Sequence, residues 1–133
     1  MVSPNGRWIA FVGDFGGQYQ VYVQPFPSFA GRWQVSREGG AGPRWSRDGS
    51  ELFYMSGDQL YSVPIKPGTD FVPGEPRVLF RVDHPVSTEW NDIYDVSPDG
   101  KRFLFLVRSK EASKTPRLDV VLNFSRQLAG ATP

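Results

Sequence analysis

The chain has 133 residues and a mass of 14.9 kDa, which is the size of one ordinary domain. Fifteen Lys and Arg residues against fourteen Asp and Glu residues leave a formal net charge of +1, so nothing predicts binding to nucleic acid or to a membrane surface. Cysteine is absent, which excludes disulfides, thiolate metal sites and thiol nucleophiles. No signal peptide opens the sequence, and we expect the chain as given to be soluble and cytoplasmic.

One four-residue phrase, Ser-x-Asx-Gly, occurs three times. The phrases begin at Ser3, Ser46 and Ser97, so the repeats start 43 and 51 residues apart. Repeats of about 40 to 50 residues that contain several strands are typical of the blades of β-propellers. Fourteen Gly and twelve Pro also favour short strands with tight turns over helices.

Each phrase predicts a corner between two antiparallel strands. Pro4 and Pro98 preset the backbone angle that the second place of a type I turn requires. Asn or Asp favours the third place, and glycine supplies the left-handed residue that closes the corner. We therefore interpret Asp48 and Asp99 as turn residues rather than catalytic carboxylates.

The first repeat, at about residues 1–40, predicts blade 1. Trp8, Ala10 and Val12 are expected on one face of its first strand, opposite Phe11, because side chains alternate along a strand. Residues 32–36 predict its outer strand, and most of its inner strand is missing.

The second repeat, at about residues 41–86, predicts blade 2 with four antiparallel strands. A tight hairpin over residues 56–59 joins the middle pair. The predicted strands, from the inner to the outer one, are residues 43–46, 51–56, 59–65 and 77–81.

The third repeat, at about residues 87–126, predicts blade 3, and a tail follows at 127–133. All three blades belong to one domain, residues 1–133. No outer strand is evident here, and the only expected helix is a turn or two over residues 123–128. The predicted strands are residues 93–96, 102–108 and 118–123.

These strands are apolar on both faces, which is typical of sheets covered on both sides. Three stacked blades form an open wedge, and its two end faces expose apolar residues that mark an interface. The predicted fold is therefore an all-β propeller fragment of three mostly four-stranded antiparallel blades, which completes a six-bladed ring by head-to-tail homodimerisation. Residues expected on the exposed end faces include some of Trp8, Phe11, Phe103 and Phe105.

Two stretches, RWSRDGSELFY (44–54) and YDVSPDGKRFLF (94–105), resemble the WD40-like PD40 repeats of TolB-type propellers. The order of motifs from residue 21 to residue 65 looks closer still to the propellers that end many bacterial receptor-like serine/threonine kinases. This resemblance implies a protein-interaction platform, in a family whose members are often periplasmic or extracytoplasmic. Family propellers close with six or more blades, whereas this chain holds three, and no kinase motif or hydrolase nucleophile elbow is present.

The stretch most typical of a binding site is residues 87–97, because an inner strand lines the axial channel of a propeller and its preceding loop opens at the channel mouth. Carboxylates that converge on the axis suit Ca²⁺, which takes six to eight oxygen ligands. The alternative is that these residues are solvated polar groups, since their spacing matches no EF-hand loop. The candidate ligand-binding residues are Trp90, Asn91, Asp92, Tyr94 and Asp95, and the candidate calcium ligands are Glu89, Asp92 and Asp95.

Two functions fit these features. The first is a non-enzymatic propeller module, without a cofactor, that self-assembles and binds a protein or peptide at the channel mouth. The alternative is a calcium-dependent hydrolase of esters or lactones, similar in plan to six-bladed lactonases. A third interpretation is that the chain is a truncated gene product without an independent function. No catalytic residue is assigned, because the lone His84 beside Pro85 is typical of plain surface.

Overall fold

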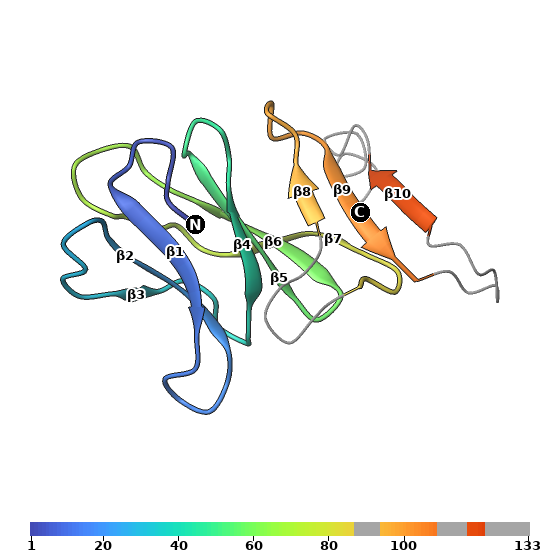
Figure 1. Ribbon diagram of the computed structural model, residues 1–133, viewed down its shortest axis with the longest axis horizontal. Helices are drawn as coiled ribbons and strands as arrows, with labels where there is room; N and C mark the ends of the chain where they lie inside the picture. The colour runs from blue at the N-terminus through green and yellow to red at the C-terminus, as the bar shows by residue number, and fades with distance from the viewer. Residues whose placement is uncertain (87–93, 109–116, 122–133) are drawn as a thin grey trace.

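The computed structural model describes residues 1–86 and 94–108 together with the backbone of residues 117–121. These parts contain ten strands in three antiparallel sheets, which stack side by side like blades (Figure 1). No helix occurs in the described ranges, and none there is long and apolar enough to cross a membrane. The expected helix at residues 123–128 lies outside them.

Blade 1 is a three-stranded sheet in the order β1-β2-β3. Its strands are β1 (Trp8–Gly13), β2 (Gln20–Pro25) and β3 (Trp33–Gln34). In place of an inner strand, Val2 forms a single bridge to Ile9 on the free edge of β1. The prediction that this blade lacks most of its inner strand is confirmed.

Blade 2 has all four strands, in the order β4-β5-β6-β7. The strands are β4 (Ala41–Trp45), β5 (Glu51–Ser56), β6 (Gln59–Pro64) and β7 (Arg77–Arg81). The bounds of β5 and β7 are those that the sequence predicts, and Ser56 pairs with Gln59 across the predicted hairpin.

Blade 3 shows three strands in the order β10-β9-β8. They are β8 (Tyr94–Val96), β9 (Phe103–Val107) and β10 (Arg117–Val121). Each begins within one residue of its predicted start. In chain order they are the inner and the two middle strands, as predicted.

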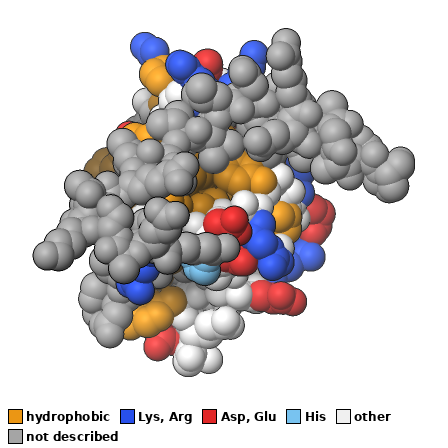
Figure 2. Space-filling model, turned by 90° about the vertical axis from the view of Figure 1, so that its right-hand side faces the viewer, with side chains coloured by type: hydrophobic (Ala, Val, Ile, Leu, Met, Phe, Trp, Pro, Cys, Tyr) orange, Lys and Arg blue, Asp and Glu red, His pale blue; other side chains and the backbone are white. Residues whose placement is uncertain are grey.

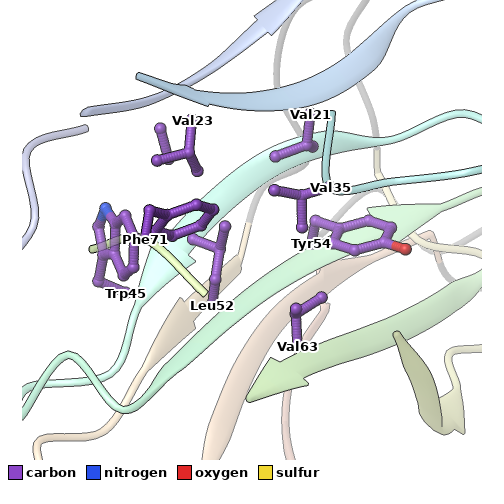
Figure 3. Packing of buried hydrophobic residues seen from close by; sticks show 9 residues of the cluster. Val21, Val23, Val35, Trp45, Leu52, Tyr54, Val63 and Phe71 are labelled. Carbon is purple, nitrogen blue, oxygen red and sulfur yellow. The ribbon is translucent and has the colours of Figure 1, made fainter. Parts of the chain in front are cut away.

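The first of two hydrophobic cores, seam 1, lies between blades 1 and 2 (Figure 3). Valines from β2 pack there against Leu52 and Tyr54 of β5, and all these side chains are buried. At its rim Trp8 and Trp33 both contact Phe71, with ring centroids 5.4 and 5.3 Å away. Trp8 is therefore packed against seam 1, and Trp33, which is 38% exposed, lies at its edge. The buried members of seam 1 are Ala10, Val21, Val23, Val35, Trp45, Leu52, Tyr54, Val63 and Phe71.

The second core, seam 2, lies between blades 2 and 3. Phe53 and Met55 point into it, whereas their neighbours Leu52 and Tyr54 point into seam 1. Strand β5 is therefore buried on both faces, as its apolar sequence predicts. The buried members of seam 2 are Phe53, Met55, Leu60, Val82, Tyr94, Phe103, Phe105 and Val107.

The expectation that Phe103 and Phe105 could lie on an exposed end face is wrong. They are only 1% and 2% exposed, because they face blade 2 inside seam 2. Residues next to them in sequence point to the opposite side of the sheet, where Leu104 is 37% exposed. The end face of blade 3 is thus formed around Leu104 and Leu106.

Candidate functional site

The three Ser-x-Asx-Gly corners share one hydrogen-bond network. In the second corner, the Ser46 hydroxyl donates to Asp48 Oδ1 at 2.8 Å and accepts the Glu51 N–H at 2.9 Å. Asp48 Oδ1 also accepts the Ser50 N–H at 3.0 Å, and Gly49 has a φ of 74°. The corners that begin at Ser3 and Ser97 repeat these bonds.

These bonds lower the pKa values of both turn aspartates. The N–H and hydroxyl of Ser50 and the hydroxyl of Ser46 lower the pKa of Asp48 to about 2. The Ser97 hydroxyl, and then the Lys101 N–H, lower the pKa of Asp99. Both carboxylates accept hydrogen bonds within their own corners. The interpretation of Asp48 and Asp99 as turn residues is confirmed.

A groove of about 580 Å³ separates the second and third corners. Three carboxylates line it, but each has a protein partner. Asp48 and Asp99 bind their own corners, and Glu51 accepts a hydrogen bond from Ser62. No group of three His, Asp or Glu side chains that could hold a metal ion occurs among the described residues.

Tyr94, a predicted ligand contact, lies inside seam 2 and is 5% exposed. Its hydroxyl donates to the Gly42 carbonyl of blade 2 at 2.6 Å, and its ring stacks on Phe105 with centroids 5.3 Å apart. The Arg44 guanidinium of β4 lies 5.7 Å from the same ring. Tyr94 therefore joins two blades, which the sequence did not indicate.

Asp95, the next predicted site residue, is exposed on β8. Its carboxylate accepts the N–H of Val96 at 2.8 Å. Asp95 points away from seam 2, since side chains alternate along β8. The other predicted ligand-binding and calcium residues, Glu89, Trp90, Asn91 and Asp92, lie outside the described residues.

A stacked aromatic pair recurs on the same side of every blade. In blades 2 and 3 the pair faces the preceding blade and is covered by it. In blade 1 no described blade covers the pair. The three pairs are Phe11 with Tyr22 (5.8 Å, 26°), Tyr54 with Tyr61 (5.1 Å, 3°) and Tyr94 with Phe105 (5.3 Å, 12°).

The blade 1 pair belongs to a surface that we call the open face of blade 1, formed by Ile9, Phe11, Phe15, Tyr22 and Arg32. Phe15 and Arg32 contact the Tyr22 ring, which is 6% exposed. Phe15 is 55% exposed and contacts the Tyr22 ring edge-on at 5.0 Å. The Arg32 guanidinium lies 3.9 Å from the centre of the Phe15 ring. This cation–π contact fixes an aromatic surface at the end of the wedge.

The opposite end is the open face of blade 3, formed by Asp95, Arg102, Leu104 and Leu106. A largely apolar groove of about 290 Å³ runs along it. Arg102 at its edge lies 4.0 Å from the Asp99 carboxylate. Figure 2 views the molecule from this end and shows hydrophobic side chains on it.

Comparison with known proteins supports the architecture. No protein-family model matches the chain, and no curated protein sequence matches it. Among solved structures, the chain is similar to the crystal structure of TolB from Acinetobacter baumannii, with a TM-score of 0.57 and 16% sequence identity. The likeness covers 92% of this chain but only 31% of the TolB chain. This likeness shows the fold: the chain is a partial β-propeller, similar in architecture to that of TolB.

Proposed function

We propose that the chain is a non-enzymatic interaction module that self-assembles through the open faces of blades 1 and 3. One observation carries this proposal. Every sheet is apolar on both sides, yet only blade 2 is covered on both sides by described residues. Phe15 and Leu104 are 55% and 37% exposed on the two ends.

The hydrophobic effect provides the driving force. Removing apolar surface from water gains about 25 cal/mol per Å², and stable interfaces bury about 800 Å² on each partner. A sheet face that carries two leucines or a stacked aromatic pair is chemically the same as the faces that already form the seams. Covering the open faces with further blades therefore stabilises the assembly by the same contacts.

The module would bind a protein or peptide at the mouth of the channel that the inner strands line. The half-buried Arg44 belongs to one of these inner strands, β4. It would provide a basic contact for a polar peptide. The proposal thus assigns the open faces to assembly and the inner strands to the ligand.

Light scattering on the purified chain, over a range of micromolar concentrations, tests self-assembly. We expect a mass of twice 14.9 kDa. Leu104→Asp should give the monomer mass, because it places a charge in the covered face. Val78→Asp is the matched control, since Val78 is 42% exposed on β7, away from both open faces. A mass of 14.9 kDa for the unmodified chain at every concentration would refute the proposal.

A further inference from the structure

Counting from each corner serine aligns the three blades residue by residue. Residues six and eight places after the serine point to one side of the blade. They are Ile9 and Phe11 in blade 1, Leu52 and Tyr54 in blade 2, and Phe103 and Phe105 in blade 3. Residues seven and nine places after it point to the other side. They are Ala10 and Val12, Phe53 and Met55, and Leu104 and Leu106.

Both seams combine these two sides in the same way. In seam 1, Ala10 and Val12 of blade 1 pack with Leu52 and Tyr54 of blade 2. In seam 2, Phe53 of blade 2 meets Phe103 of blade 3, with ring centroids 5.1 Å apart. A seam therefore always joins the seven/nine side of one blade to the six/eight side of the following blade.

The ends of the wedge are the two unmatched halves of such a seam. Among the described residues, no other blade covers the seven/nine side of blade 3, with Leu104 and Leu106, or the six/eight side of blade 1, with Ile9 and Phe11. The open face of blade 3 and the open face of blade 1 are therefore complementary. Two copies of the same open face would form a contact that neither seam contains.

Charge favours the same arrangement. The open face of blade 1 carries Arg32, for which no ion pair occurs among the described residues, and the open face of blade 3 carries the exposed Asp95. Arg102 on the latter face is already near Asp99. Joining two blade 1 ends would bring two Arg32 side chains together, whereas joining unlike ends brings Arg32 and Asp95 to one interface.

We infer that the occupant of each open face is a second copy of this chain, joined head to tail in the register of seams 1 and 2. In this interface Leu104 of one copy packs against Ile9 of the other, and Leu106 packs against Phe11. Two copies present two such interfaces and close a ring of six blades. This inference rests on the proposed self-assembly and specifies its geometry.

Site-directed crosslinking tests the register, and the cysteine-free sequence makes it specific. One preparation carries Ile9→Cys and another carries Leu104→Cys. Sheets packed face to face lie about 10 Å apart, which is beyond the reach of a disulfide. A short bismaleimide crosslinker is therefore used, and products are separated on a denaturing gel. Light scattering first establishes the mass of each variant.

We expect neither variant alone to give a crosslinked dimer, and an equal mixture of the two to give one. Leu104→Cys mixed with Val78→Cys should give none, because Val78 lies on β7, away from both open faces. The double variant Ile9→Cys/Leu104→Cys should stop at the dimer. A dimer from Leu104→Cys alone would overturn the head-to-tail arrangement, and a ladder of larger products would overturn closure by two copies.

The two proposals fail in different ways. A monomeric mass for the chain would refute self-assembly itself. A dimeric mass without a crosslinked product in the mixture would refute only the head-to-tail register and would leave self-assembly standing.

Discussion

The bond between Tyr94 and Gly42 gives a sharp test of how the blades are held together. Tyr94→Phe removes the hydroxyl that donates to the Gly42 carbonyl at 2.6 Å and leaves the ring in place. The carbonyl belongs to a buried residue of β4, so its lost partner is not replaced by water. The substitution therefore weakens the link between blades 2 and 3.

The expected loss follows from the geometry. A buried hydrogen bond contributes about 1 kcal/mol net, and an acceptor left buried without a partner costs about 1 to 3 kcal/mol. We expect Tyr94→Phe to lower the free energy of unfolding by about 1 to 3 kcal/mol.

Tyr54→Phe is the matched control. Tyr54 is 2% exposed and also stacks on an aromatic ring, but no hydrogen bond of its hydroxyl is found among the described residues. Burial raises the pKa of Tyr54 to about 12, so the hydroxyl is uncharged and its removal loses no charge. Its loss should change the stability by less than about 0.5 kcal/mol.

Urea denaturation at one fixed protein concentration measures both variants. Fixed concentration matters because assembly shifts the apparent stability. Equal destabilisation by the two substitutions, or none by Tyr94→Phe, would refute the role assigned to the inter-blade hydrogen bond.

Four further outcomes are expected. Asp48→Ala should lower the melting temperature at neutral pH, whereas Asp48→Asn, which copies Asn5 of the first corner, should keep the bonds. The lowered pKa of Asp48 means that its contribution is full above about pH 4 and is lost as the pH falls toward about 2, so Asp48→Asn should flatten this part of an acid titration of stability. Gly6→Ala should cost about 1 kcal/mol in urea denaturation, because φ is 70° there and no atom lies within 4 Å of an added Cβ. Leu52→Ala should cost about 2 to 5 kcal/mol, and Val78→Ala, at a residue that is 42% exposed on β7, far less; equal losses would contradict the burial of Leu52 in seam 1. Calcium should leave the melting temperature unchanged for the proposed module, and an increase, with ester hydrolysis lost on chelation, would favour the calcium-dependent hydrolase instead.

The architecture was predictable because its signals are local. The Ser-x-Asx-Gly phrase specifies a corner by side-chain hydrogen bonds within six residues, and the glycines at its end adopt φ values of 69° to 74°. Strands apolar on both faces then require stacked sheets. Strand β5 begins and ends at the predicted residues for these reasons.

It was harder to predict which side of each strand faces which neighbouring blade. The alternation of side chains divides a strand into two sides but does not indicate which blade covers each side. Phe103 and Phe105 could have formed the end face or a seam on the sequence pattern alone. Tyr94 looks like a channel residue in sequence, and only its partner Gly42, 52 positions away, shows that it joins two blades. Such long-range partners have no local signal.

The double burial of β5 has a consequence for how substitutions combine. Leu52 and Phe53 are adjacent in sequence but insert into separate cores, so their effects on stability should be nearly additive in a double-mutant cycle. Phe53 and Phe103 are 50 positions apart yet touch, so their effects should be strongly non-additive. Whether two substitutions affect each other therefore depends on whether their side chains lie on the same side of a blade. Distance along the chain does not predict it.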